Sequence, residues 1–402
     1  MIDKRTKTKN GRRLFGAAAA IFMSLGAAAP AFAVSPPFAY TEEEWAMLRD
    51  NILEYGEIPN LINEYNVVIQ NNDETYKKLR SQKTSEKGRE ELEETADRLH
   101  EQAADMADIM SDPMMALLTN SYSQLLYASH SMESGALQVE QQIESYIIDG
   151  PLLKHQFDHI QAMLTATAQD LMISHEKLVV NQELVEKSED LLKAVLESTE
   201  RQKKLGMATE NDVLGAQQNV KNLQTSKMQI ESGIRSIRQN LCLLTGWDYD
   251  ASPEIRPIPD PDVAYLEHAD VQADIIHATE NNYMLKYDKR SLENTTEEYS
   301  KENLKRTIRE KEQSISKSIT SLYDAAGQAR RELEEAQNAV MTAQKNLDTS
   351  KRQKELGSIG DLQLMQMQNA YDSAVSKEKT ARLSLFQAIE TYRRAVEGYL
   401  AA

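Results

Sequence analysis

The stretch "RQKKLG" occupies residues 201–206, and "RQKELG" returns at residues 352–357 with five of its six letters unchanged. Each copy stops at a glycine, Gly206 in the first and Gly357 in the second. Glycine takes the left-handed backbone conformation that closes many helices at little steric cost. The repeated stretch therefore predicts that one helix ends at each glycine and that another begins just beyond it.

The residues after each glycine carry helix-start signals. Thr209 precedes Asp212 by three positions, which is a variant of the capping box that satisfies free amides at a helix start. Ser358 and Asp361 show the same spacing after the second glycine. We therefore expect both new helices to begin with a side-chain cap.

Apolar residues recur every seven positions after both glycines, with nine of ten positions apolar or aromatic in each copy. In the first copy these positions are Val213, Ala216, Val220, Leu223, Lys227, Ile230, Ile234, Ile237, Leu241 and Leu244. Such heptads are typical of coiled-coil seams. A similar pattern from Ile308 to Leu356 predicts a helix roughly 70 Å long at about 1.5 Å per residue. The sequence thus predicts an all-α fold of long antiparallel coiled-coil hairpins in two internal repeats.

The charged exceptions to the two seams are Lys227 and Glu378, which occupy the same layer of the two copies. Single polar seam positions can set helix register, so one interpretation is a polar layer that fixes the register. The alternative is that both side chains reach solvent from the edge of the seam.

The composition argues against several functions. The chain has 402 residues with a formal net charge of −17, which disfavours binding to nucleic acid. The single cysteine, Cys242, allows no disulfide within the chain and is expected to pack as a small apolar residue. "HQFDH" places His155 and His159 one helical turn apart, but no third ligand is near in the sequence, so we interpret them as surface residues. We expect neither an enzyme nor a metal or other cofactor.

Residues 1–33 resemble a secretory signal peptide. Six basic residues lead into the apolar run "LFGAAAAIFMSLGAAA", and "AFA" ends at Ala33. We expect cleavage there and export of the rest of the chain.

Prolines then divide the exported part. The only interior Pro-rich segment is "ASPEIRPIPDPD" at 251–262, which predicts a linker between a first repeat at 34–250 and a second repeat at 263–402.

The two repeats resemble the TolC family of outer-membrane efflux channels. The first copy reads Gly206, Thr209, Asp212-Val213-Leu214 and Ala216, and its helix closes with "LCLLTG" at Gly246. The second reads Gly357, Gly360, Gln363-Leu364 and Met367, and closes with "RRAVEG" at Gly398. "IPNL" (58–61) and "NNYMLKYDKRS" (281–291) stand where that family begins each repeat.

The resemblance implies a homotrimer whose hairpins close a TolC-like α-barrel. It also implies that the turns dock on a membrane fusion (adaptor) protein of an inner-membrane or ABC transporter. Carried over to this chain, the adaptor-binding tip residues are Leu205, Gly206, Met207, Thr209, Leu356, Gly357 and Ser358. Family members also insert membrane β-hairpins, but the corresponding stretch between Tyr287 and Ile308 is charged and helical in pattern. We therefore expect little or no β-barrel.

Two functions remain open at this point. The first is a duct component of a tripartite efflux or export system, located in the outer membrane and periplasm if the host has two membranes and otherwise extracytoplasmic. The alternative is an exported coiled-coil scaffold of the cell envelope that transports nothing.

Overall fold

The computed structural model of the protein describes residues 35, 39–81, 93–101, 103–104, 133, 135 and 149–400. The predicted signal peptide, residues 1–33, lies outside the described residues.

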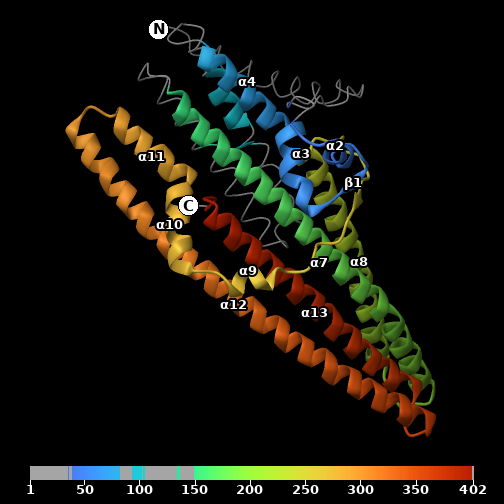
Figure 1. Cartoon of the computed structure of the whole chain (residues 1–402). Coiled ribbons are helices and arrows are strands. Elements are labelled where there is room, and N and C mark those ends of the chain that lie inside the picture. Colours follow the sequence, from blue (N-terminus) through green and yellow to red (C-terminus); the bar gives the residue numbers. More distant parts are fainter. Residues whose placement is uncertain are drawn as a thin grey trace, which may run out of the picture.

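Four long helices dominate the molecule and form two antiparallel hairpins (Figure 1). The first hairpin consists of α7 (Gly150–Lys204) and α8 (Glu210–Leu244), and the second of α12 (Glu298–Glu355) and α13 (Asp361–Val396). With 58 residues, α12 is about 87 Å long, so it exceeds the length expected from the sequence. The predicted fold class, all-α with two long hairpins, is confirmed.

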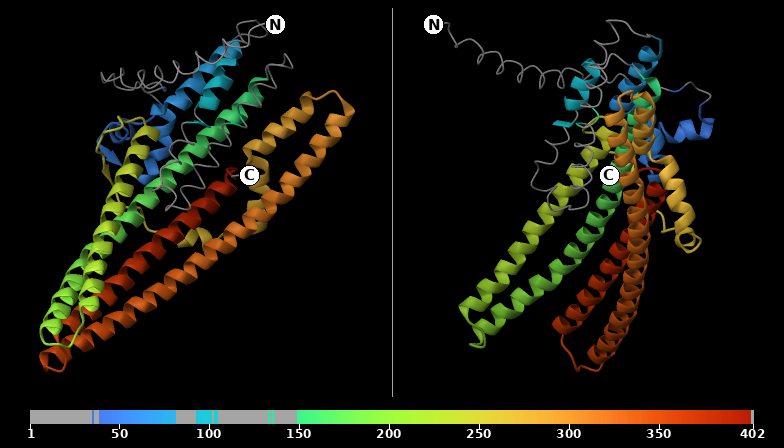
Figure 2. Two further views of the ribbon diagram at one scale, coloured as in Figure 1. Left: turned by 180° about the vertical axis from the view of Figure 1, so that it is seen from behind. Right: turned by 90° about the vertical axis from the view of Figure 1, so that its left-hand side faces the viewer.

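The hairpins pack along their inner helices. α7 contacts α8 and α13, and α13 contacts α12, so the order across the layer is α8–α7–α13–α12 (Figure 2). The predicted seams lie inside each hairpin: Val213, Ile230 and Ile237 of α8 are buried, as are Ile319 and Leu347 of α12. Burial of these side chains supplies the main driving force for the pairing.

Short elements gather at the end of the molecule opposite the two turns (Figure 1). They are α2 (Glu42–Met47), β1 (Ile52–Leu53), η1 (Tyr55–Glu57), α3 (Ile58–Tyr65), α4 (Val67–Ser81), β2 (Glu254–Ile255), α10 (Val271–Asn281) and α11 (Tyr283–Asn294). A further short helix, α9 (Val263–Glu267), lies part-way along α12 and α13. β1 and β2 pair in parallel, which ties the start of the described chain to the Pro-rich segment. Among the described residues, no helix combines the length and apolar character needed to cross a membrane.

The Pro-rich segment runs beside the inner helices rather than hanging free. The backbone N–H of Ile258 donates to the Glu176 carboxylate of α7, and Asp262 pairs with Arg393 of α13 at 2.8 Å. The segment therefore carries the chain across α7 and α13 toward the second hairpin.

The end of each hairpin opposite its turn is closed by a glycine that touches another backbone. Gly246 has φ +81°, and a Cβ there would lie 2.6 Å from the Tyr65 carbonyl oxygen. Gly398 has φ +103°, and a Cβ there would lie 2.4 Å from the Asn281 carbonyl oxygen. No larger residue fits at either position without displacing its neighbour, because backbone atoms of Tyr65 and Asn281 lie within 3 Å of the added Cβ.

Two buried asparagines hold these closures together. The side-chain amide of Asn66 donates to the Leu244 carbonyl at 2.8 Å, while its oxygen accepts from the N–H of Val68 at the start of α4. Asn282 does the same in the second half, donating to Gly398 at 3.2 Å and accepting from Leu285 of α11 at 2.9 Å. The two halves of the chain thus repeat this arrangement of a glycine and a buried asparagine, as well as the hairpin itself.

The closures generate a first prediction. Gly246→Ala introduces a Cβ into the Tyr65 backbone at positive φ, and we expect a loss of about 3 kcal/mol or more in the free energy of unfolding. Gly206→Ala is the matched control, because Gly206 has φ +72° but nothing within 4 Å of its added Cβ. Left-handed strain alone should cost about 1–2 kcal/mol there. Urea denaturation of both variants gives the comparison, and equal losses would contradict the close packing at Gly246.

Candidate functional site

The first hairpin turn is closed by two backbone hydrogen bonds. The Gly206 N–H donates to the Lys203 carbonyl at 2.9 Å, and the Met207 N–H donates to the Gln202 carbonyl at 2.8 Å. This pair of bonds defines a Schellman motif, which requires the left-handed residue that Gly206 supplies with φ +72°.

The second turn repeats this geometry. The Gly357 N–H donates to Lys354 at 2.9 Å, the Ser358 N–H donates to Gln353 at 2.8 Å, and Gly357 has φ +72°. The prediction that a positive-φ glycine ends each helix is confirmed in both copies.

The helix starts differ between the copies. Thr209 caps α8 as expected, since its hydroxyl accepts from the Asp212 N–H while the Asp212 carboxylate accepts from the Thr209 N–H at 2.7 Å. The expected Ser358–Asp361 cap is wrong: Gly360 is the N-cap of α13, without a side-chain bond. Because the turn spans the same number of residues in both copies, the cap falls three positions after the glycine, at Gly360.

A salt bridge crosses each turn, and sequence reasoning missed both. Lys203 pairs with Glu210, and Lys354 pairs with Asp361 at 2.7 Å. The signal was present in the sequence, because a lysine precedes an acidic residue by seven positions in each copy. These pairs are exposed, so each stabilises its turn by about 1 kcal/mol at most.

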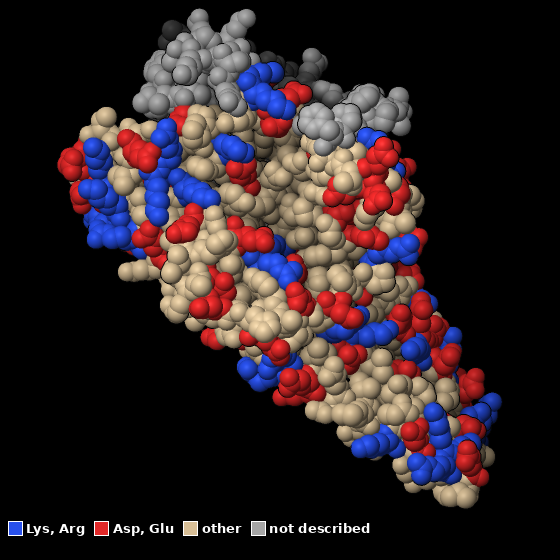
Figure 3. All heavy atoms as spheres, in the orientation of Figure 1, with Lys and Arg blue, Asp and Glu red and all other residues tan. Residues whose placement is uncertain are grey.

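The turns expose large apolar side chains. The exposed fractions are 74% for Leu205, 75% for Met207 and 81% for Leu356. Thr209 and Ser358 are also exposed. Both turns lie at the same end of the molecule, where uncharged surface stands between positive and negative side chains (Figure 3). The structure thus brings the predicted tip residues to one end.

Polar contacts between α7 and α13 join the two hairpins and so position the turns relative to each other. From the base toward the tips they are Asp170–Arg394, Lys177–Gln387 (2.9 Å), Glu183–Lys379 (2.9 Å), Lys187–Asp372 (3.3 Å) and Ser188–Asn369 (2.7 Å). Hydrogen bonds of defined direction set the register of this contact more strictly than apolar packing would.

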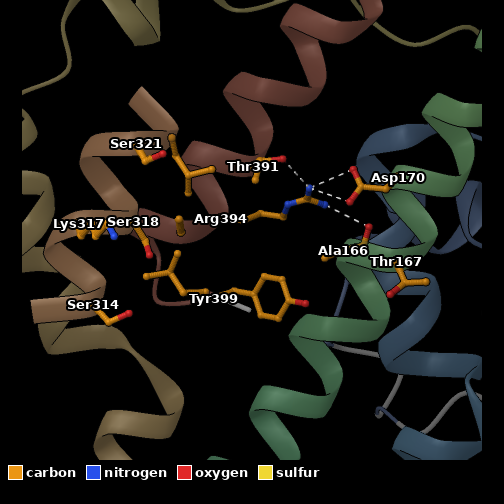
Figure 4. Close-up of a pocket in the computed structure, with 13 residues that line it drawn as sticks. Ala166, Thr167, Asp170, Ser314, Lys317, Ser318, Ser321, Thr391, Arg394 and Tyr399 are labelled. Atoms are coloured by element: carbon orange, nitrogen blue, oxygen red, sulfur yellow. Dashed lines mark hydrogen bonds and ion pairs between the residues drawn. The ribbon is translucent and has the colours of Figure 1, made fainter. Parts of the chain in front are cut away.

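Arg394 and Asp170 form the buried member of this row (Figure 4). One guanidinium nitrogen donates to both Asp170 oxygens at 3.1 Å, and the other donates to the Ala166 carbonyl. Burial alone would lower the pKa of Arg394, but the Asp170 carboxylate outweighs this effect and raises that pKa. Arg394 therefore stays charged and holds α13 against α7.

A pocket of about 430 Å³ lies beside Arg394, between α7, α12 and α13 (Figure 4). Ser314, Ser318 and Lys317 of α12 line one side, and Tyr399 lies opposite. Burial raises the pKa of Tyr399 to about 12, so its hydroxyl stays protonated. The lining offers hydrogen-bond donors to a polar molecule.

Lys227 and Glu378 lie on different hairpins. Lys227 of α8 is about one-third exposed and pairs with Glu186 of α7 at 3.5 Å, within the first hairpin. Glu378 of α13 is half-buried. Their proposed role as a register-setting polar layer stays a prediction.

The interpretation of His159 as a surface residue is wrong. Its side chain is buried, with its ring 5.9 Å from the Tyr399 ring and 6.4 Å from the Tyr283 ring. Burial, assisted by the charge of Lys311, lowers its pKa to about 4, so the imidazole is neutral and packs as an aromatic group. Across the described ranges, no cluster of three or more His, Cys, Asp or Glu residues could hold a metal ion.

Comparisons with known proteins give distant structural likenesses. No protein-family model and no curated protein matches the sequence. The outer-membrane channel OprN is similar over 89% of this chain and 93% of its own, with 12% identity and a TM-score of 0.48. VceC from Vibrio cholerae covers 86% of this chain and 97% of its own, with 11% identity and a TM-score of 0.44. CmeC from Campylobacter jejuni covers 69% and 68%, with 10% identity and a TM-score of 0.40. The fold assignment therefore rests on the hairpins themselves.

The polar seam positions generate a second prediction. If Lys227 and Glu378 set the register, replacing both with Leu should raise the melting temperature but yield several oligomeric masses, because an apolar layer accepts more than one alignment. Native mass spectrometry and thermal unfolding measure the two effects. Lys221→Leu with Lys377→Leu is the control, since both of these lysines are exposed on the same two helices. A single unchanged mass with a raised melting temperature would rule out the polar layer.

Proposed function

We propose that this protein is a TolC-like duct component of an efflux or export system, which docks on a periplasmic adaptor through its two hairpin turns. The observation that carries the proposal is the pair of turns: two Schellman closures with the same geometry place Leu205, Met207 and Leu356 at one end of the molecule. Exposed apolar side chains that gather in one place, rather than singly, are typical of sites that bind another protein.

The tips suit a partner with an apolar pocket. Burying a leucine or methionine side chain is worth about 1.5–3 kcal/mol, and a few such residues commonly dominate the energy of an interface. The Schellman closures hold these side chains on a rigid turn, which reduces the entropy lost on binding. The partners that fit are an adaptor and, through it, an inner-membrane or ABC transporter.

The layer of long helices suits a closed assembly. Among the long helices, α8 packs chiefly on α7 and α12 chiefly on α13, so each outer helix has a side available for another copy. Three copies joined through α8 and α12 would close a tube, with residues 34–250 and 263–402 supplying equivalent repeats around the linker 251–262. The cell envelope, at the outer membrane and periplasm, is the proposed location.

The proposal predicts loss of docking when the tips are made polar. Leu205→Asp with Leu356→Asp should weaken adaptor binding at least tenfold and abolish adaptor-dependent export, because two apolar contacts become buried carboxylates. Folding should be unchanged, since both side chains are exposed. Val67→Asp with Ile276→Asp is the control, as these residues are 65% and 61% exposed and lie far from the turns. Normal adaptor binding by the tip variant would contradict the docking site.

The assembly is a separate prediction. Residues 34–402 should have the mass of a homotrimer, and negative-stain images should show a hollow cylinder. Monomers or solid rods would instead favour the exported scaffold, which keeps the hairpins without transport.

A further inference from the structure

The pocket between α7, α12 and α13 lies where α13 ends and the other two helices continue past it (Figure 1). Its volume is about 430 Å³, which is within the range of sites that hold small molecules. The two hairpin turns lie at the far end of the molecule, so this pocket is separate from the proposed docking site.

The charged residues that line the pocket leave one positive charge uncompensated. Arg394 pairs with both oxygens of Asp170, so the charges of these two residues cancel. The third charged residue is Lys317, which forms no ion pair within the described part of the chain. The pocket therefore presents a free ammonium group, although the chain as a whole has a formal net charge of −17.

The lining also holds polar hydrogens that have no acceptor among the described residues. The Arg394 Nε is buried and donates to nothing, and such a group normally has a partner. The Tyr399 hydroxyl makes no hydrogen bond there and stays protonated, because burial raises its pKa to about 12. Three hydroxyls of α12 are likewise without a hydrogen bond, and they belong to Ser314, Ser318 and Ser321.

The end of α13 beside the pocket opposes an anion less than a free helix end would. A helix C-terminus disfavours negative charge because its last carbonyls are unsatisfied. Here the Gly398 N–H donates to the Ala395 carbonyl at 3.1 Å, and the Tyr399 N–H donates to the Arg394 carbonyl at 2.9 Å. Both of these carbonyls therefore have a partner.

The free donors lie on more than one side of the pocket. Lys317 and the three serines follow one another at intervals of three or four residues on one face of α12. Tyr399 lies opposite, and Arg394 lies between that face and α7 (Figure 4). A tetrahedral oxyanion has oxygens that point in several directions, so it suits donors on several sides better than a planar carboxylate does.

We propose that this pocket binds the phosphate group of a small organic phosphate. Lys317 supplies the opposite charge, and the hydroxyls of the α12 serines and of Tyr399 donate hydrogen bonds to the phosphate oxygens. The bound molecule would contact both hairpins at once, because α12 belongs to the second hairpin and α7 to the first.

The test measures binding of glycerol 3-phosphate by isothermal titration calorimetry at constant ionic strength. We expect saturable binding of glycerol 3-phosphate and none of glycerol, which lacks only the phosphate group. Lys317→Gln should weaken the binding about tenfold or more, because the phosphate loses its charge-assisted contact. Ser318→Ala with Ser321→Ala keeps the charge of the pocket and should weaken the binding severalfold.

Lys345→Gln is the matched control. It removes the same charge from an exposed position of α12 outside the pocket, so it should leave the affinity unchanged. The proposal would be overturned by binding that does not saturate, by equal binding of glycerol, or by equal affinities of the native protein and Lys317→Gln. An equal loss in Lys345→Gln would also overturn it, since general attraction between charges would then explain the binding. The assay contains no adaptor, so its outcome is independent of whether the tips dock.

Discussion

The left-handed conformation at a few glycines is the constraint on which this architecture depends. Helices of 55 and 58 residues reverse here within a short turn because one residue in each turn takes positive φ, a geometry that returns the last free carbonyls to the chain. Gly206 and Gly357 provide this at the tips, and Gly246 and Gly398 at the opposite ends. A side chain at these positions would oppose the reversal, at a cost of about 1–2 kcal/mol at the tips and more at Gly246 and Gly398, where the added Cβ would meet another backbone.

The left-handed glycines have different surroundings at the two ends of the hairpins. At the tips nothing lies within 4 Å of an added Cβ, and the neighbouring leucines and methionine point into solvent. At the closures the glycines lie against the backbones of Tyr65 and Asn281, where Asn66 and Asn282 join three segments. One end is therefore committed to internal packing, while the other remains available to a partner.

The hairpins meet through a row of polar contacts as well as through apolar packing, in which Leu383 and Phe386 of α13 join the buried cluster around α7. The buried pair Asp170–Arg394 has little value as net stabilisation, because desolvation cancels much of the attraction. The pair instead restricts how α13 aligns with α7, since two carboxylate oxygens and a planar guanidinium can pair in only a few orientations. Such a contact fixes how α13 lies against α7 and so constrains where the two tips lie relative to each other.

The sequence by itself determined the features that depend on residues close together along the chain. The repeated "RQKKLG" and "RQKELG", the heptads and the Thr209–Asp212 cap predicted two hairpins with glycine turns, because backbone bonds in a turn join residues three to five positions apart. The Ser358 cap failed because its spacing matched a motif while the repeated turn length placed the helix start at Gly360. Only the tertiary structure decided the burial of His159, the asparagine closures and the Asp170–Arg394 contact. Their partners lie between 116 and 240 positions away along the chain, and no local pattern encodes which surfaces will meet once the helices pack.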